Sequence, residues 1–178
     1  MYYSGIIKDD VANGIGIRTT LFVSGCRNNC PGCFNKAEQD FQFGVPYTEA
    51  VTKEILDSIS PYHKGITIMG GDPMEPENAR DLCLDLVAKF RQKFGNKKDI
   101  WVYTGYKFEY LLSCGDPYIL QLLSMTDILV DGPFIESEKD VTLMFKGSRN
   151  QRTIYVPKSL KEQCVITIDN LDKIPKKV

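Results

Sequence analysis

The sequence has little histidine: among its 178 residues there is one, His63, in the segment Pro-Tyr-His-Lys-Gly. A hydrolase built on a Ser-His-Asp or Cys-His arrangement would have to depend on this residue, and no motif beside it indicates one. We therefore expect His63 to lie in a surface loop before a strand, without a catalytic role.

Long apolar runs and a large excess of one charge are absent as well. No stretch approaches the roughly 20 apolar residues that a membrane-spanning helix needs, and the first ten residues lack the apolar core of a secretory signal. The net charge of −1 gives no reason to expect nucleic acid or an anionic membrane as a partner. We expect a cytoplasmic protein whose thiols stay reduced.

Cysteine is present six times, and three of the six form the run Cys26-Arg-Asn-Asn-Cys30-Pro-Gly-Cys33. No other Cys or His precedes Cys26 or lies between Cys33 and His63, whereas structural zinc sites and most iron–sulfur clusters take four ligands. Three thiolates can hold three corners of a 4Fe-4S cubane and leave the fourth iron open to a small molecule. This loop is therefore a candidate active site.

Short runs of β-branched and aromatic residues alternate with helical patterns along the chain. This alternation predicts an α/β fold, with a mostly parallel sheet covered by helices. With 43% hydrophobic residues, we expect one domain over residues 1–178, with a loose Lys-rich tail after about residue 171. The expected helices are 48–59 and 78–94, with one or two short ones between 103 and 128. The expected strands are 19–23, 66–69, 100–103, 128–130 and, less regular, 153–156 and 165–168.

Four unusual segments each follow the end of a predicted strand. They are the cysteine loop, Gly70-Gly71-Asp72-Pro73, Thr104-Gly105-Tyr106 and Asp131-Gly132-Pro133. The carboxyl ends of parallel strands lie at one edge of the sheet, where ligands bind in α/β proteins. The four segments should therefore meet at one site.

Each segment after the cysteine loop allows two interpretations, one as part of a binding site and one as ordinary structure. The backbone of Gly70 and Gly71 can be approached closely by a ligand, and Asp72 can accept a hydrogen bond from an ammonium group, but the same residues form ordinary strand-to-helix turns. Thr104 and Asp131 can meet a ligand or cap strand ends. The loop at 147–152 reads as a solvated turn, and Arg18 either reaches the site or lies on the surface.

The cysteine loop also has a second reading, as a zinc site completed by a distant ligand. The available residues are His63, Cys83, Cys114 and Cys164. Structural zinc sites usually take their ligands as two close pairs, which a compact triplet does not supply. We expect Cys83, Cys114 and Cys164 to be buried and inert.

The cysteine spacing together with Gly-Gly-Asp-Pro resembles the radical S-adenosylmethionine enzymes. More closely, most of the chain resembles the family of activating proteins of anaerobic ribonucleoside-triphosphate reductases. In the wider superfamily an aromatic residue often precedes the third cysteine, whereas here Gly32 precedes it and Phe34 follows it. The segments that carry the closer resemblance are 20–26, 30–36, 70–73, 100–106, 128–134 and 147–152.

The resemblance implies a partial (βα)-barrel and a radical mechanism. In such enzymes an external donor, typically reduced flavodoxin, supplies one electron to the cluster, and S-adenosylmethionine bound at the open iron is cleaved to methionine and a 5′-deoxyadenosyl radical. An activating enzyme then removes a hydrogen atom from a glycine in the large subunit of the reductase, its protein partner. The implied metal ligands are Cys26, Cys30 and Cys33. The implied S-adenosylmethionine contacts are Gly32, Phe34, Gly70, Gly71, Asp72, Thr104 and Asp131.

Two alternatives stay open at this point. The chain could activate a different glycyl-radical enzyme or act on a small molecule, or it could be a non-catalytic, zinc-stabilised binding module. The sequence also leaves open whether the protein is a monomer or a homodimer, and what the segment after residue 156 does.

Overall fold

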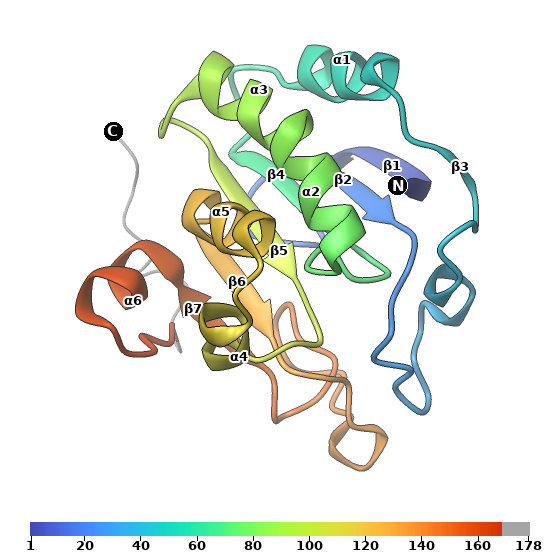
Figure 1. Ribbon diagram of the computed structural model, residues 1–178, viewed down its shortest axis with the longest axis vertical. Coiled ribbons are helices and arrows are strands. Elements are labelled where there is room, and N and C mark those ends of the chain that lie inside the picture. The colour runs from blue at the N-terminus through green and yellow to red at the C-terminus, as the bar shows by residue number, and fades with distance from the viewer. Residues whose placement is uncertain (169–178) are drawn as a thin grey trace.

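The computed structural model describes residues 1–168 as a seven-stranded sheet with helices packed against it (Figure 1). The strand order across the sheet is β3-β1-β2-β4-β5-β6-β7. The predicted tail after residue 171 lies outside the described residues. The strands are β1 (Tyr2–Asp10), β2 (Arg18–Val23), β3 (Val45–Pro46), β4 (Gly65–Gly70), β5 (Asp99–Tyr103), β6 (Ile128–Asp131) and β7 (Arg152–Tyr155).

The centre of the sheet is parallel, as predicted. β2, β4, β5 and β6 run side by side in parallel, whereas β1, β3 and β7 add antiparallel strands at the two sides. β1 is absent from the prediction because its Ser, Gly, Lys and Asp residues hide the alternation, and two irregularities interrupt its register with β2. Residues 165–168 form one antiparallel bridge, Thr167 to Ile154, instead of a strand.

The helices follow the predicted pattern with one correction. The segment expected as a single helix over 78–94 begins at Pro76 and is divided at Asp85, whose backbone leaves the helical region (φ −128°, ψ −86°). Asp85 instead accepts a hydrogen bond from the Thr52 hydroxyl (2.6 Å). The helices are α1 (Glu49–Ser58), α2 (Pro76–Leu84), α3 (Leu86–Phe94), α4 (Phe108–Ser113), α5 (Pro117–Met125) and α6 (Val156–Glu162), with 3-10 turns η1 (Lys36–Gln39) and η2 (Glu136–Glu138).

The main core lies between the sheet and the helices. Alternate residues of the parallel strands face α1, α2, α3 and α5, because side chains along a strand point to opposite faces. This face and the helices bury, among others, Ile66, Ile68, Ile100, Val102, Leu82, Leu86, Phe90 and Leu122. The rigid layer holds the strand ends in place, and with them the loops that follow.

The opposite face of the sheet carries a smaller apolar cluster. Trp101, Ile128 and Val130 are buried there, and Phe145 packs its ring edge-to-face on Trp101 with centroids 5.4 Å apart. Loops, not helices, supply this cover. The two faces are therefore closed by different kinds of structure.

The edge where the parallel strands begin holds Arg18, which neither reaches the cysteine loop nor lies on the surface. Its side chain is fully buried, donates to the Thr67 hydroxyl (2.8 Å) and to the Ile66 carbonyl (2.7 Å), and forms an ion pair with Asp99. Both positions predicted for Arg18, at the site or on the surface, were therefore wrong. Its charge serves to join β2, β4 and β5.

His63 also lies at this edge and is buried, so the expectation of a surface position was wrong. Its ring stacks on Tyr62 (centroids 4.8 Å apart) and its Nδ1 accepts a hydrogen bond from the Ser60 N–H (3.1 Å). Burial lowers the pKa of the imidazole. Within residues 1–168, no helix has the length and apolar character needed to cross a membrane.

Candidate metal centre

A cavity of about 140 Å³ lies where the parallel strands end, as the positions of the special segments predict. All three clustered cysteines line it, together with the turns that follow β4, β5 and β6. The lining residues are Cys26, Asn28, Cys30, Cys33, Asn35, Met69, Gly70, Gly71, Asp72, Tyr103, Thr104, Gly105, Gly132, Phe134 and Gln151.

The cysteine loop is folded tightly so that its thiols face one space. Two residues take a left-handed backbone, Asn29 (φ 45°) and Gly32 (φ 71°), and the Cys33 N–H donates to the Cys30 carbonyl (3.2 Å). The loop is tied at its base, where the Cys26 N–H donates to the carbonyl of Gln39 (3.2 Å). Cys26, Cys30 and Cys33 are all free, half-buried thiols.

The protonation of these thiols follows from their burial. Burial, with a further contribution from the nearby Asp72 carboxylate, raises the pKa of Cys26 to about 11, and burial also raises the pKa of Cys30. Both thiols are therefore protonated at neutral pH when no metal is bound. Because a metal takes the thiolate, its binding must release protons from this loop.

The Gly-Gly turn after β4 packs directly on the cysteine loop. A side chain at Gly70 would lie 2.6 Å from the Val23 carbonyl oxygen, and one at Gly71 would lie 2.7 Å from the carbonyl oxygens of Gly25 and Glu38. Gly70 also has φ 107°, which favours glycine. We expected these glycines to let a ligand approach the backbone closely. In the structure, the segments around Val23, Gly25 and Glu38 already approach it that closely.

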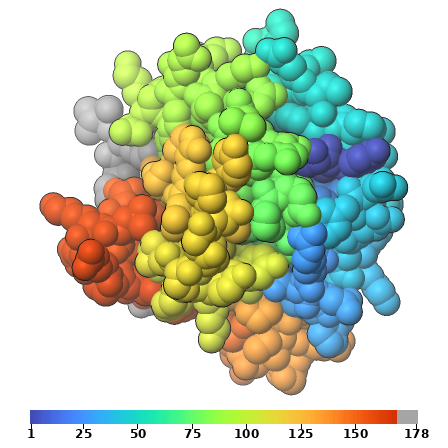
Figure 2. All heavy atoms as spheres, in the orientation of Figure 1, coloured from blue at the N-terminus to red at the C-terminus, as the bar shows by residue number. Residues whose placement is uncertain are grey.

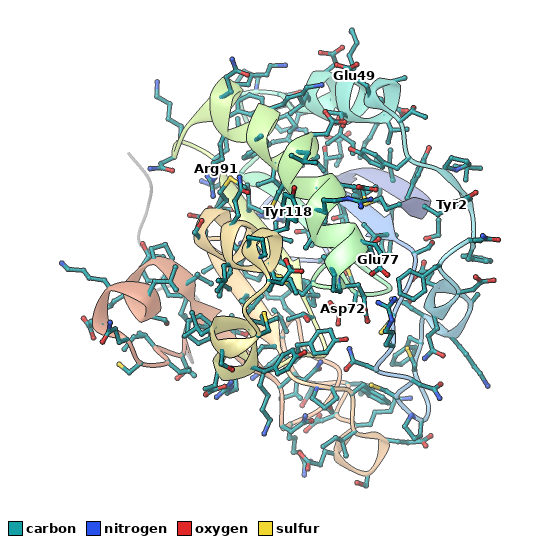
Figure 3. The ribbon with its side chains drawn as sticks, viewed as in Figure 1. Tyr2, Glu49, Asp72, Glu77, Arg91 and Tyr118 are labelled. Carbon is teal, nitrogen blue, oxygen red and sulfur yellow. The ribbon has the colours of Figure 1, made fainter. Side chains whose placement is uncertain are left out.

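Asp72 joins three of the loops around the cavity. It is fully buried, and its Oδ2 accepts from the Asn28 amide (2.8 Å), the Thr104 hydroxyl (3.1 Å) and the Gly105 N–H (2.9 Å). Its Oδ1 accepts from the Met74 N–H (2.9 Å). Burial raises the pKa of this carboxyl to about 7 despite these donors. Figure 3 shows Asp72 beside the N-terminal end of α2.

Glu75, which the sequence reading did not single out, fixes the other side of the cysteine loop. Its buried Oε1 accepts from the Arg27 N–H (2.7 Å) and the Tyr106 hydroxyl (3.0 Å). Arg27 forms ion pairs with Glu75 and, at 2.6 Å, with Glu77 on the first turn of α2 (Figure 3). The sequence feature that could have identified Glu75 is its position three residues after Asp72, immediately before a helix that begins with proline.

Asp131 does not line the cavity. It is fully buried at the end of β6, where its Oδ2 accepts from the Phe108 N–H (2.8 Å) and its Oδ1 from Arg152 Nε (2.9 Å). Arg152 also pairs with Glu109 (2.9 Å). These bonds join the end of β6 to the start of α4 and to β7.

Gly32 and Phe34 also lie outside the cavity lining. Gly32 faces the Glu136 side chain, whose carboxyl carbon would lie 2.8 Å from a Cβ at that position. Phe34 is 75% exposed and contacts Phe134 edge-to-face, with ring centroids 6.0 Å apart. These two residues therefore border the cavity from the outside, whereas Phe134 faces it.

The loop at 147–152 is more than the solvated turn expected from the sequence. The Asn150 amide donates to the Pro133 carbonyl (2.7 Å), and the Gln151 amide donates to the Gly132 carbonyl (3.0 Å). These bonds hold the segment after β6 against the cavity, which Gln151 itself lines. The amide side chains of Asn150 and Gln151 were the sequence feature that could have predicted this role.

The residues that could complete a zinc site are elsewhere. Neither His63 nor Cys83, Cys114 or Cys164 lines the cavity. Cys83 is buried in α2 and donates to the Tyr118 carbonyl (3.3 Å), Cys114 is half-buried, and Cys164 is exposed. The expected burial is confirmed for Cys83 and was wrong for Cys164. The zinc reading therefore loses its proposed fourth ligands.

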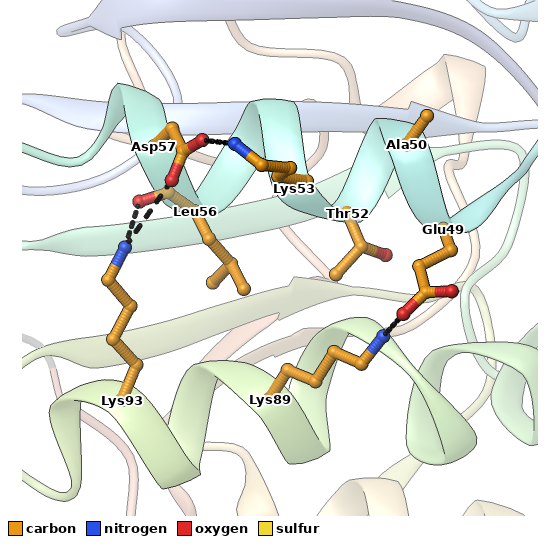
Figure 4. A pocket seen from close by; sticks show the side chains of 8 residues that line it. All are labelled: Glu49, Ala50, Thr52, Lys53, Leu56, Asp57, Lys89 and Lys93. Atoms are coloured by element: carbon orange, nitrogen blue, oxygen red, sulfur yellow. Dashed lines mark hydrogen bonds and ion pairs between the residues drawn. The ribbon is translucent and has the colours of Figure 1, made fainter.

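A larger hollow lies between α1 and α3, away from the cysteine loop (Figure 4). Its charged groups pair with one another: Lys89 with Glu49 (2.5 Å), and Lys93 and Lys53 with Asp57. It contains no cysteine or histidine. We assign the chemistry to the smaller cavity because that one gathers thiols, glycine backbone and a buried carboxylate.

The donor set of the smaller cavity fits an iron–sulfur cluster, because thiolates are the usual ligands of such clusters. Three thiols line it, and within residues 1–168 neither a fourth cysteine nor a histidine joins them there. Gly70, Gly71 and the hydroxyl-bearing Thr104 line the same cavity. The cavity therefore offers polar backbone and a hydroxyl to a small molecule beside the thiols.

Comparison with known proteins identifies the family. Residues 12–154 match the model of a family described as a 4Fe-4S single cluster domain. The anaerobic ribonucleoside-triphosphate reductase-activating protein of Escherichia coli K12 is 40% identical over 154 residues, which cover 85% of this chain and 96% of that protein. The proteins of the same name from Haemophilus influenzae and phage T4 are 38% and 37% identical, covering 85% of this chain and 96% and 92% of theirs. The chain belongs to the family of anaerobic ribonucleoside-triphosphate reductase-activating proteins.

Proposed function

We propose that this protein is a radical S-adenosylmethionine enzyme that generates a glycyl radical on an anaerobic ribonucleoside-triphosphate reductase. The observation that carries the proposal is the cavity in which Cys26, Cys30 and Cys33 meet without a fourth Cys or His among the described residues that line it. The names of the relatives supply the target enzyme. Activation of another glycyl-radical enzyme is not favoured, because the eight matching relatives all carry this one name.

In this proposal Cys26, Cys30 and Cys33 hold a 4Fe-4S cluster, and the surrounding loops fix their positions. A reduced cluster held there would supply the one electron that reductive cleavage of S-adenosylmethionine requires, and hydrogen-atom abstraction from the target glycine would follow. The thiols lose their protons as the cluster is inserted. Glu75 and Asp72 hold the cysteine loop in place by accepting hydrogen bonds from the Arg27 N–H and the Asn28 amide.

The same geometry divides the predicted contacts with S-adenosylmethionine into two groups. Gly70, Gly71, Asp72 and Thr104 line the cavity, so we assign them to the wall that receives its methionyl end. Asp72 acts there chiefly by holding Thr104 and Gly105 in place, because its oxygens already accept four hydrogen bonds. Gly32, Phe34 and Asp131 shape the surroundings of the cavity.

The wider features of the proposal follow from the family resemblance. We infer that the sheet is the partial barrel of radical S-adenosylmethionine enzymes and that residues 1–178 form one domain. A reduced flavodoxin or a similar protein is the proposed electron donor, and the cytoplasm, where thiols stay reduced, is the proposed compartment. A homodimer remains part of the proposal, without a surface assigned to it.

The test is an anaerobic mixture of reduced protein, S-adenosylmethionine and the reductase of the same organism, examined by EPR. We expect the doublet of a glycyl radical, and we expect it to be lost when S-adenosylmethionine is omitted. A protein with an intact cluster that cleaves S-adenosylmethionine and yet produces no glycyl doublet would defeat the assignment to this reductase.

A zinc-loaded, colourless protein after anaerobic purification would contradict the proposal of a 4Fe-4S cluster. We expect instead a brown protein with about four irons per chain, the content of one 4Fe-4S cluster. Metal analysis and the absorbance near 400 nm measure this independently of any partner.

A further inference from the structure

A lobe formed by residues 133–149 projects beside the cavity and includes η2. Figure 2 shows it at one end of the molecule, next to the cysteine-loop region. The lobe meets the cysteine loop and the residue after it: the Glu136 side chain faces Gly32, the ring of Phe34 packs against Phe134, and Lys139 Nζ lies over the ring of Phe34 at 4.8 Å from its centroid. The lobe is thus part of the rim of the cavity.

The inner side of the lobe is firmly attached to the rest of the protein. Phe145, with a left-handed backbone (φ 59°), packs on Trp101. The buried hydroxyl of Ser148 accepts from the Ile135 N–H (3.2 Å) and donates to Asn150 Oδ1 (2.6 Å). The lobe therefore has a fixed shape before any partner binds.

The tip of the lobe is closed by a second set of bonds. Asp140 Oδ1 accepts from the N–H (3.0 Å) and hydroxyl (2.6 Å) of Thr142, and its Oδ2 accepts from Arg149 Nε (3.0 Å). These bonds hold the pKa of Asp140 at about 2, so its charge is present at neutral pH. A preformed turn loses less conformational entropy when it binds.

The outer side of the lobe exposes large apolar side chains. Val141 is 87% exposed and Met144 is 63% exposed, and Phe34, whose ring packs on Phe134 of the lobe, is 75% exposed. We call Phe34, Val141 and Met144 the rim patch. None of these three side chains is buried in a core cluster of residues 1–168, although the turn that carries Val141 and Met144 is ordered by the Ser148, Asp140 and Phe145 contacts described above. Exposed apolar side chains held together in this way are typical of an interaction surface.

We propose that the rim patch is the docking surface for the glycine-bearing segment of the reductase. This inference rests on the proposed function. The glycine Cα–H must come to the mouth of the cavity to lose its hydrogen atom. The lobe that carries Val141 and Met144 borders the cavity through Phe134, and the ring of Phe34 packs on Phe134. An electron donor needs no such access, because an electron can cross several ångströms of protein to reach the cluster.

This difference in access indicates that the rim patch binds the glycine-bearing segment and not the electron donor. A backbone segment that enters the mouth must lie along its rim and cover the neighbouring side chains, which favours apolar residues next to the target glycine. Met is well suited to such a surface because its flexible, polarisable side chain adapts to the partner. The apolar contacts would also exclude water from the mouth while the radical is present.

The experiment compares the double variant V141D/M144D with a matched control in the complete protein. The control is V11D/L84D, which places the same charges at two other exposed apolar positions (69% and 63% exposed) outside the lobe. Each protein is reduced with dithionite, and three quantities are measured. They are iron content, cleavage of S-adenosylmethionine without reductase, and the reductase concentration that gives half of the maximal glycyl EPR signal.

We expect V141D/M144D to keep its iron and its partner-independent cleavage within about twofold, but to need at least about tenfold more reductase, the size of effect seen at central interface residues. V11D/L84D should match the wild type in all three. An unchanged reductase requirement in V141D/M144D would overturn the inference. A wild-type protein that cleaves S-adenosylmethionine but gives no glycyl signal would instead defeat the proposed function.

Two further measurements keep the result interpretable. If V141D/M144D loses its iron, V141S/M144S replaces it, since serine adds no charge to the lobe and should still raise the reductase requirement. The assay is then repeated with reduced flavodoxin as donor. A defect seen with flavodoxin and absent with dithionite would assign the rim patch to the electron donor and overturn the proposal.

Discussion

At the edge where the parallel strands begin, Arg18 is buried under the chain's own loop, whereas at the edge where they end, Asp72 is buried beside a cavity. Arg18 donates to Thr67, Ile66 and the Ile15 carbonyl (3.1 Å), and Gly14 packs so closely that a Cβ there would lie 2.8 Å from Arg18 Cδ. Asp72 accepts four hydrogen bonds, yet the loops that supply them stop short of closing the space.

The difference shows that neither a buried charge nor a glycine-rich loop marks a site by itself. Both edges have both features. What distinguishes the second edge is that its loops bring three thiols to a space that the chain leaves open. Four predictions test whether the first edge serves stability and the second serves chemistry.

The largest effect is expected for Cys30→Ala. Two thiolates cannot hold three corners of a cubane, so the protein should lose nearly all of its iron and its cleavage of S-adenosylmethionine. Iron analysis and absorbance near 400 nm measure the loss. Cys164→Ala, which removes an exposed cysteine outside the cavity, is the control and should keep about four irons. Normal iron in Cys30→Ala would show that the cavity is not the cluster site.

Arg18→Met should have the largest effect on stability. It removes a fully buried charge from its hydrogen-bond partners, for which a loss of about 3–5 kcal/mol in the free energy of unfolding is typical. Chemical denaturation of the metal-free protein measures it, and Arg80→Met, at an exposed pair with Asp81, should cost under about 1 kcal/mol. The folded Arg18→Met protein should cleave S-adenosylmethionine normally per bound cluster. A loss of cleavage per cluster would contradict the assignment of the first edge to stability alone.

Gly71→Ala tests the packing of the turn on the cysteine loop. A Cβ would meet the backbone of Gly25 and Glu38, and such overpacking typically costs about 1–3 kcal/mol. We expect lower iron occupancy together with lower stability. Gly5→Ala is the matched control, because that position has open space around it. If Gly71→Ala keeps wild-type iron and stability, the glycine is not needed for this contact.

The smallest effect is expected for His63 and depends on pH. Burial lowers its pKa in the folded protein, so the unfolded chain binds more protons just below pH 6.5 and stability falls as the pH falls through that range. In His63→Asn this component should disappear. The free energy of unfolding of metal-free wild type, minus that of the variant, should therefore be larger at pH 7.5 than at pH 5.5. A difference that does not change with pH would contradict the burial of a neutral imidazole.

Much of the fold follows from the sequence because the parallel strands are buried on both faces. Their continuous β-branched and aromatic runs identify β2, β4, β5 and β6, and the topology rule for strand ends then places the site. β1 escapes this reasoning because it pairs antiparallel at one side of the sheet and mixes polar with apolar residues. The break at Asp85 coincides with a hydrogen bond from Thr52, 33 positions away, which no local pattern contains.

The convergence of the three cysteines on one cavity was predictable, and the residues that support them were less so. Three cysteines in one loop must lie close together whatever the rest of the chain does. Whether Asp131 meets a ligand or an arginine depends on Arg152, which reaches it only after β7 has paired with β6. The roles of Glu75 and Gln151 likewise arise from contacts between distant segments.

The central claim is that the open iron of a three-cysteine cluster binds S-adenosylmethionine in this cavity. The most direct measurement is electron–nuclear double resonance on the reduced protein with S-adenosylmethionine labelled with nitrogen-15 at its amino group. We predict a nitrogen-15 hyperfine coupling to the cluster, which the unlabelled compound does not show. A reduced cluster with the labelled compound bound and no such coupling would contradict the account.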